Sequence, residues 1–277
     1  MTPDTTARLF EAVCLAELHA LKPGNVHVHA GGHGMEVAQF ERAAAAAAPA
    51  IATPGLGIGA RIEAAVSASL AAAGCNTNLG IILLCAPLIQ AAQDRQTGPL
   101  RERVEQVLDA LTVEDAACAF RAITAANPGG LGTAPADVRA PTTLNLKAAM
   151  AQAEDRDRIA FQYTHGFADI FHIGTARLRG SSDPTGAEVV QALYLDFLSA
   201  FPDSHISRKF GLTTAEGVRA EARRLVSNLA GATHEARHVR LLAFDADLKA
   251  RGLNPGTSAD LTVASLLAHL LEVRAHG

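Results

Sequence analysis

Apolar residues recur at helical spacing along almost the whole chain. Over 5–21 they include Leu9, Phe10 and Val13, which follow the 3.6-residue period of an amphipathic helix. The same criterion predicts helices at 40–51, 59–73, 79–92, 101–111, 113–126, 144–164, 186–200, 215–229, 234–250 and 259–275. No long stretch alternates with a period of two, and no strand–helix–strand order is evident. The pattern predicts an all-α fold, a single compact multi-helix bundle that comprises residues 1–277.

Local sequence signals mark helix starts and one irregular segment. Thr112 with Asp115 three residues later resembles a capping pair, and Thr213 with Glu216 has the sequence of a capping box. The segment 127–143 is rich in Gly, Pro and Thr, so it is the only plausible domain boundary. Because it is short, we expect it to lie within one domain.

Four junctions rich in Asn and Gly lie beside the predicted helices. They are the segments 22–25 (Lys-Pro-Gly-Asn), 76–80 (Asn-Thr-Asn-Leu-Gly), 127–132 (Asn-Pro-Gly-Gly-Leu-Gly) and 254–260 (Asn-Pro-Gly-Thr-Ser-Ala-Asp). Such residues expose backbone N–H groups and tolerate unusual dihedral angles. A helix N-terminus after such a loop attracts phosphate, because free N–H groups and the helix dipole point the same way. The junctions therefore predict a shared site for a phosphorylated ligand.

Composition limits the classes of partner. The chain is rich in alanine, lacks Trp and carries a formal net charge of −4, which argues against a general nucleic-acid binder. The most apolar run, 79–92, contains Pro87 and is too short to span a bilayer, so it is expected to be a buried helix. The start of the chain has no apolar secretory core, and four cysteines show no metal-binding spacing. We expect a cytoplasmic protein with free thiols, no membrane contact and a possible homodimer.

The first junction and the histidines after it carry candidate chemistry. Lys22 could hold a phosphate as a point charge while Gly24 lets the backbone approach a ligand, although a simple helix stop with an exposed Lys is the competing interpretation. His27, His29 and His33 follow with HxHxxxH spacing. Without an HExxH helix or a nearby Cys pair, a proton donor or ligand contact is favoured over a metal site.

The helix starts at 59 and 79 carry further polar candidates. Glu63, in an otherwise apolar helix, would face either a polar cavity or solvent. Of Asn76, Thr77 and Asn78, one must cap the buried helix that follows, which leaves two side chains for a ligand.

Two charged clusters lie in the second half of the chain. Asp155-Arg156-Asp157-Arg158 is predicted to lie inside a helix, where Asp157 could pair with Mg²⁺ or belong to a solvated surface run. Asp203, Ser204 and His205 precede two basic residues. A serine hydrolase is disfavoured, because triads assemble across a fold and no G-x-S-x-G elbow is present. Anion binding by the basic pair Arg208 and Lys209 is preferred.

The order of four motifs resembles one enzyme family. The motifs are Lys22-Pro23-Gly24-Asn25-Val26, Gly59-Ala60-Arg61-Ile62, Asn76-Thr77-Asn78-Leu79-Gly80 and Gly256-Thr257-Ser258-Ala259-Asp260-Leu261. Together they resemble the triphosphoribosyl-dephospho-CoA synthase family, the ATP:dephospho-CoA triphosphoribosyltransferases. The resemblance implies an all-α fold, ATP and dephospho-CoA as substrates, and transfer of the triphosphoribosyl group with release of adenine.

Roles for individual residues follow from this resemblance and from residue type. ATP and substrate binding is expected of Lys22, Gly24, Asn25, Arg61, Asn76, Thr77, Asn78, Gly129, Gly130, Gly132, Arg208, Lys209, Ser258 and Asp260. Glu63, Asp115 or Asp157 would hold Mg²⁺ or stabilise positive charge at the anomeric carbon, and His33 or His205 would donate a proton.

One segment departs from the family pattern. Members associated with citrate lyase have Asn-Thr-His-(Lys/Arg)-Gly where this chain has Asn-Thr-Asn-Leu-Gly at 76–80. The segments 127–132 and 155–160 resemble a branch found in methanogens and methylotrophs. An enzyme of one-carbon carrier cofactor synthesis (methanopterin or methanofuran type) and a non-catalytic nucleotide-binding protein are therefore alternatives. An ordinary helical bundle is disfavoured by the order of the motifs.

Overall fold

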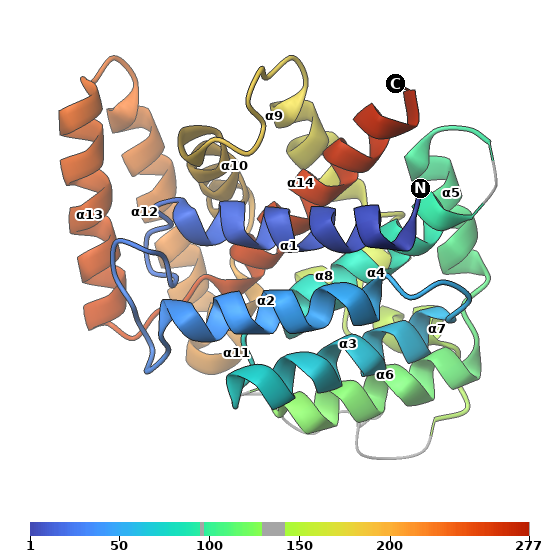
Figure 1. Cartoon of the computed structure of the whole chain (residues 1–277). Coiled ribbons are helices and arrows are strands. Elements are labelled where there is room, and N and C mark those ends of the chain that lie inside the picture. The colour runs from blue at the N-terminus through green and yellow to red at the C-terminus, as the bar shows by residue number, and fades with distance from the viewer. Residues whose placement is uncertain (95–96, 129–141, 277) are drawn as a thin grey trace.

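A computed structural model describes residues 1–94, 97–128 and 142–276 of the chain (Figure 1). In these ranges the secondary structure is helical, apart from two isolated β-bridges between residues 27 and 35. The elements are α1 (Pro3–His19), α2 (Val37–Ile51), α3 (Ile58–Ala73), α4 (Leu79–Gln93), α5 (Leu100–Asp109), α6 (Val113–Ala126), α7 (Leu146–Ala151), α8 (Arg158–Thr164), the π-helix η1 (Ile170–Thr175), α9 (Ala176–Leu178), α10 (Ala187–Ala200), α11 (Ser204–Phe210), α12 (Leu212–Leu229), α13 (His234–Ala250) and α14 (Gly256–His276). The predicted all-α class is confirmed.

Most predicted helices match observed ones to within a few residues. The capping pair at α6 is confirmed, because Thr112 Oγ1 accepts from the N–H of Asp115 and the Asp115 side chain accepts from the N–H of Thr112. The cysteines are free, as expected, and three of the four are buried. No helix in the described part of the chain is long and apolar enough to cross a membrane.

The single helix predicted over 144–164 is wrong. The chain forms α7 and α8 instead, and residues 155–157 belong to the connection between them. The cause is a new helix start, since Asp157 Oδ1 accepts from the N–H groups of Ile159 and Ala160 and so caps α8. The charge cluster is therefore a helix junction rather than part of a helix.

Two other helix starts also differ from the prediction. The capping box at Thr213 is not formed, because α12 begins at Leu212 directly after Gly211, which has a φ of +88°. The last helix starts at Gly256, three residues before the predicted start. Its first turn is capped from a distant segment, since Asp203 Oδ2 accepts from the N–H and the hydroxyl of Ser258.

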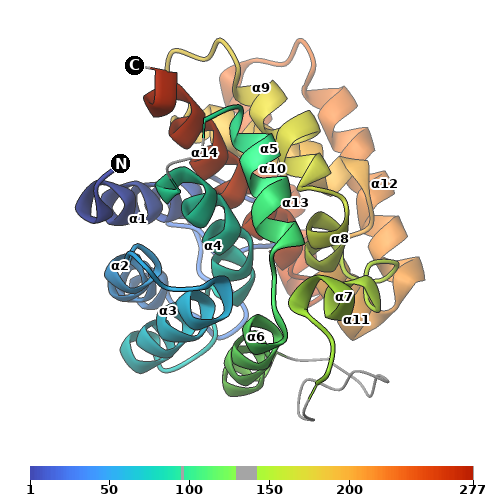
Figure 2. The same ribbon diagram turned by 90° about the vertical axis from the view of Figure 1, so that its right-hand side faces the viewer.

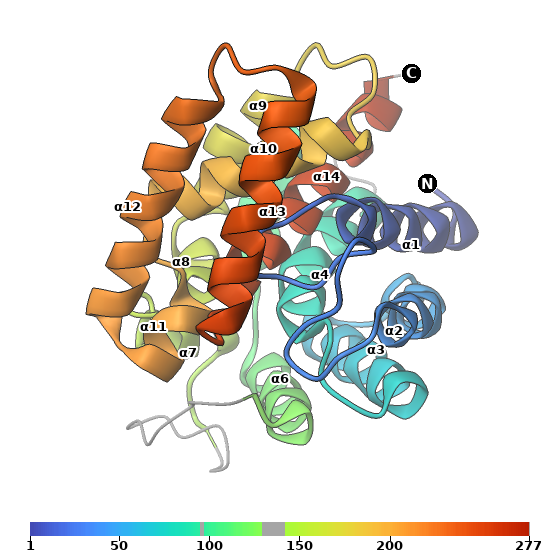
Figure 3. The same ribbon diagram turned by 90° about the vertical axis from the view of Figure 1, so that its left-hand side faces the viewer.

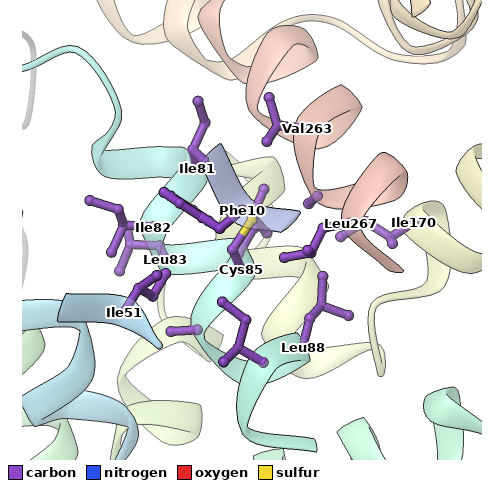
Figure 4. Close-up of a cluster of buried hydrophobic side chains, with 14 of the residues drawn as sticks. Phe10, Ile51, Ile81, Ile82, Leu83, Cys85, Leu88, Ile170, Val263 and Leu267 are labelled. Carbon is purple, nitrogen blue, oxygen red and sulfur yellow. The ribbon is translucent and has the colours of Figure 1, made fainter. Parts of the chain in front are cut away.

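The main hydrophobic core surrounds α4 and α14. The α4 helix is buried on nearly every side, and it packs against α14, α5 and α3. Figure 4 shows Ile82, Leu83 and Leu88 of α4 close to Phe10 of α1 and Leu267 of α14. Burial of each such side chain contributes about 1.5–3 kcal/mol. This packing fixes the N-terminal ends of α4 and α14 in space.

A second apolar cluster joins the α10–α13 region to the rest of the chain. It contains Tyr194 and Leu198 of α10, Val218 of α12 and Leu248 of α13, all fully buried. Figure 3 shows α12 and α13 on the side of the molecule that faces the viewer, and an ion pair between Arg251 and Glu221 of α12 links this region. The buried Tyr194 hydroxyl donates to the carbonyl of Pro23, which connects this cluster to the first junction.

Candidate functional site

The structure contains a cavity of about 1060 Å³. In Figure 2, α2, α3 and α4 lie on one side and α7, α8 and α11 on the other. The cavity is lined by residues of all four predicted junctions, among them Asn25, Asn76, Asn127 and Asn254. Gly129, Gly130 and Gly132 lie outside the described residues. The volume is at the upper end of that for small-molecule sites, so it suits a large or composite ligand.

The N-terminal ends of two long helices face this cavity. Leu79 and Gly80 at the start of α4 line it, and so do Gly256 and Thr257 at the start of α14. Helix N-termini carry unsatisfied N–H groups and a partial positive charge. The tertiary packing therefore brings together two anion-attracting helix ends that are about 180 residues apart in sequence.

Carboxylates and cations share the cavity wall. The acidic residues Glu17, Asp157 and Asp260 come from α1, the α7–α8 connection and α14, and the basic residues Arg208 and Lys209 come from α11. The connection also places Glu154, Asp155, Arg156 and Arg158 in the lining. A ligand with both anionic groups and a centre of developing positive charge would find partners for each in this cavity.

Lys22 does not line the cavity, although it was predicted to hold a phosphate. Its side chain is fully buried, forms an ion pair with Glu17 and donates to Asn25 Oδ1 at 2.9 Å and to the Val26 carbonyl at 2.8 Å. The three ammonium protons are therefore used within the protein. Burial lowers the pKa of Lys22 and raises that of Glu17, while their mutual attraction opposes both shifts.

The first and fourth junctions are joined to each other and to α13. Asn25 donates from Nδ2 to Asn254 Oδ1 at 2.8 Å, and both residues line the cavity. Gly24, which does not line it, has a φ of +83° and donates its N–H to Asp245 Oδ1 at 2.8 Å. Asp245 also contacts Lys249 at 3.0 Å, so α13 fixes the turn that presents Asn25.

In the segment 76–78, some side chains form hydrogen bonds within the protein and some line the cavity. Asn76 caps α4, since its Oδ1 accepts from the N–H of Leu79 at 3.2 Å, and Thr77 lines the cavity beside it. Asn78 is buried outside the lining and accepts from Ser69 at 2.5 Å. Thr77 Oγ1 and Asn78 Nδ2 are buried without a hydrogen-bond partner among the described residues, so each retains an unused polar atom.

Three further predicted site residues, Arg61, Glu63 and Asp115, also lie away from the cavity lining. Arg61 is fully buried and donates to the carbonyls of Ile51 and Leu56 and to Gln90 and Gln93. Glu63 forms a bidentate pair with Arg121 at 2.7 and 2.9 Å.

Asp115 is the third of these residues. It caps α6 and accepts from the N–H of Gly59 at 2.8 Å. A Cβ on Gly59 would overlap with the Asp115 backbone. The Gly-Ala-Arg-Ile motif therefore serves helix packing between α3 and α6 in this structure.

Both candidate histidines, His33 and His205, line the cavity. His33 has a φ of +57° and its Nε2 lies 2.8 Å from the Gly24 carbonyl. Burial, together with Lys209, Arg208 and His33, lowers the pKa of His205 to about 3. His205 is therefore neutral near pH 7, and its buried Nε2 has no hydrogen-bond partner in the part of the chain that the structure describes. It suits a neutral hydrogen-bonding role better than donation from an imidazolium.

The other histidines of the HxHxxxH segment pack against α13. His27 is fully buried with its Nε2 3.2 Å from Asp245 Oδ1, and His29 lies between the rings of His27 and His238. Within the described ranges, no three His, Cys, Asp or Glu side chains are close enough to hold a metal ion. The segment is therefore a packed connection rather than a preformed metal centre.

Several site residues were missed from the sequence. Glu17 lies on the buried face of α1, and Asp203 caps α11 and the first turn of α14 together. Ser258, predicted to bind substrate, is buried outside the lining as the partner of Asp203. An isolated Glu on an apolar helix face was the one available signal for Glu17. No local signal identifies the second role of Asp203, because its partner Ser258 is 55 residues away in sequence.

Comparisons with known proteins agree with this arrangement. The family model of the ATP:dephospho-CoA triphosphoribosyl transferases matches residues 3–276. A crystal structure from Archaeoglobus fulgidus, provisionally assigned as a triphosphoribosyl-dephospho-CoA synthase, is 26% identical with a TM-score of 0.66; the alignment covers 83% of this chain and 97% of that one. No curated protein matches the chain.

An all-helical transferase with a junction-lined cavity is the class that fold, site and similarity define. The chain belongs to the family of ATP:dephospho-CoA triphosphoribosyl transferases.

Proposed function

We propose that this chain transfers the triphosphoribosyl group of ATP to a ribose hydroxyl of dephospho-CoA and releases adenine. The observation that carries the proposal is the family match over residues 3–276 together with a large cavity built from the family-like junctions. The cavity offers helix N-termini and cations for a triphosphate, and carboxylates for the sugar centre.

The triphosphate is assigned to the part of the lining that α11 and the two long helix starts provide. Arg208 and Lys209 supply positive charge, and the N-terminal ends of α4 and α14 supply N–H groups and dipoles. Because the triphosphate is transferred intact, these groups need only hold it in place. Lys22 is the buried partner of Glu17 and is not assigned to the phosphates.

The amide side chains are assigned to the ribose and the base. Asn25, Asn254 and Asn76 line the cavity and present hydrogen-bonding groups. The apolar part of the lining includes Phe40, Phe120 and Met150, which suit an adenine ring or the acceptor's long arm. Orientation of the two substrates by these groups lowers the entropic barrier to the transfer.

Mg²⁺ is proposed as the ion that accompanies the triphosphate. Asp157 fits one ligand position, since it lines the cavity and lies only 3.3 Å from Arg208, on the proposed phosphate side. Mg²⁺ is commonly bound through one or two carboxylates plus phosphate oxygens and water, so no three-residue protein cage is required. When bound, it would neutralise part of the triphosphate charge.

The predicted cytoplasmic location and homodimer remain predictions.

Adenine release provides the test of function. Purified protein with ATP and Mg²⁺ would be assayed with and without dephospho-CoA, and the products weighed by mass spectrometry. Adenine formation that depends on dephospho-CoA, with a triphosphoribosyl adduct, is the expected result. ATP binding without adenine release with any acceptor would favour the non-catalytic nucleotide-binding alternative, and an adduct on a pterin or furan acceptor alone would favour the one-carbon alternative.

Substitution of Arg208 by Met is expected to raise the KM for ATP by about 10- to 100-fold, because a charge-assisted hydrogen bond contributes about 1.5–3 kcal/mol. The value of kcat should change less, since the phosphates are bound in both ground and transition states. Steady-state adenine release at varied ATP checks this. Arg237→Met, at an exposed position of α13 outside the lining, is the matched loss of one cation and should leave KM unchanged. An unaltered KM in the Arg208 variant would remove Arg208 from the phosphate site.

A further inference from the structure

Asp260 is a half-buried carboxylate in the wall of the cavity. It lies in the first turns of α14 and lines the cavity, and it forms no hydrogen bond or ion pair with the residues that the structure describes. Of the other carboxylates in the lining, Asp155 is exposed to solvent and Glu154 lies 3.9 Å from His165, and the remaining two have partners within the protein. Glu17 is paired with Lys22, and Asp157 caps α8 and contacts Arg208. An ionisable group that is enclosed but unpaired is costly unless a ligand uses it.

The Asp260 carboxylate lies directly against Gly80 of α4. A Cβ at residue 80 would overlap with Asp260 Oδ2 and would lie 2.9 Å from the Ile159 side chain. Gly80 is in the first turn of α4 and its φ is not positive, so backbone conformation does not require glycine here. The missing side chain instead leaves room for the carboxylate at the start of α4, inside the cavity.

The charges around Asp260 favour a group that binds a proton readily. Burial and the carboxylates of Asp203, Glu17 and Asp157 raise the pKa of Asp260 well above its usual range, and Arg208 acts in the opposite direction. The other ionisable groups that interact with it are Lys22 and the buried thiols of Cys14 and Cys85. The N-terminal end of α4, like Arg208, favours the ionised form of Asp260 and so opposes the rise in its pKa. A general base works best when its pKa is close to the working pH.

We propose that Asp260 is the general base of the transfer and takes the proton from the attacking ribose hydroxyl of the acceptor. This proposal rests on the proposed function. A bond forms between the acceptor oxygen and the anomeric carbon of ATP as the bond from that carbon to the adenine nitrogen breaks. The bonding electrons leave with adenine, which gains a proton from water, while the hydroxyl proton passes to Asp260 and then to solvent. The triphosphate is unchanged, and no oxidant or reductant is needed.

The assignment explains why a carboxylate is left unpaired within reach of a triphosphate. A permanent partner would lower its proton affinity and hold it away from the hydroxyl. The same negative charge would stabilise the oxocarbenium character of the ribose in the transition state.

The test compares Asp260→Asn with the wild-type protein. We expect kcat for dephospho-CoA-dependent adenine release to fall by about 10²- to 10⁴-fold. The dissociation constant for ATP should stay within about threefold, less than 1 kcal/mol, or should fall because a negative charge near the phosphates is lost. Glu235→Gln removes an exposed carboxylate of α13 outside the lining and should retain wild-type turnover.

Two further measurements separate a base from a structural group. In Asp260→Ala, added formate should restore part of the lost turnover, because a small carboxylate can occupy the vacated space. In the wild-type protein, kcat/KM should fall as the pH drops through the raised pKa of Asp260, since the protonated acid cannot accept a proton. Asp260→Glu should keep an acidic limb at a shifted pH.

Each outcome bears on the proposal. Near wild-type kcat in Asp260→Asn would overturn it, and so would loss of ATP binding with kcat retained at saturation, which would make Asp260 a substrate-holding residue. Formate without effect on an Asp260→Ala variant that is folded by circular dichroism would also overturn it. If the wild-type protein forms no adduct with any acceptor, the proposed function itself fails, whereas an active wild type with an active Asn variant rejects only the role of Asp260.

Discussion

Replacement of Lys22 by methionine is expected to lower the free energy of unfolding by about 3–5 kcal/mol, because it leaves the buried Glu17 carboxylate without its cation. Lys22 is fully buried and Glu17 is nearly so. The variant also removes the donor to Asn25 Oδ1 and to the Val26 carbonyl. Urea denaturation followed by circular dichroism provides the measurement.

A double variant distinguishes the pair from simple packing. Lys22→Met with Glu17→Gln removes both charges at nearly constant volume, so it should recover a large part of the loss. Lys209→Met removes an exposed lysine in the same part of the protein and should change stability by less than about 0.5 kcal/mol. A loss below 1 kcal/mol in Lys22→Met, on the other hand, would mean that Lys22 is not the counter-ion of a buried carboxylate.

Addition of a single methyl group at Gly80 is expected to lower kcat about 100-fold while the helices remain folded. The new Cβ would overlap with Asp260 Oδ2, so the carboxylate must rotate or α4 and α14 must separate. Displacements near 1 Å at a reacting group can cost about 10²-fold in rate. Overpacking at the α4–α14 contact should cost about 1–3 kcal/mol in stability.

The control for this variant is a glycine in an equivalent secondary structure. Gly217 lies in α12, and a Cβ there would meet nothing within 4 Å. Gly217→Ala should therefore keep full activity and gain about 0.5–1 kcal/mol of stability from its better helix propensity. Adenine release and thermal unfolding of both variants check the pair. Full activity in Gly80→Ala would show that the position of Asp260 is not critical.

Sequence periodicity predicted most of the fold because most helices bury one continuous apolar face. Its errors occur where a polar side chain sets the boundary of a helix. Asp157 splits the helix predicted over 144–164, since it caps α8 through two backbone N–H groups. The early start of α14 depends on Asp203, which is distant in sequence and satisfies the N–H of Ser258. Neither effect is visible in a local pattern of apolar residues.

The same distinction holds for the candidate site. The junction segments identified from the sequence do line the cavity, because helix ends that carry Asn and Gly converge there. The sequence could not assign individual side chains to the cavity. Arg61 and Lys22 have the residue type of phosphate ligands, yet both are fully buried with internal partners. Glu17 lines the cavity although it lies in an ordinary amphipathic helix.

The amino-acid sequence by itself determined the helical class, the positions of most helices and the four junctions that contribute residues to the cavity lining, because these depend on local periodicity and on residues suited to turns. The tertiary structure decided which charges face the ligand. Burial makes an unpaired charge expensive, so the packing of α1, α4 and α14 selects an internal partner for Lys22 and leaves Asp260 for the cavity. That selection depends on groups far apart in the chain, and only the folded arrangement brings them together.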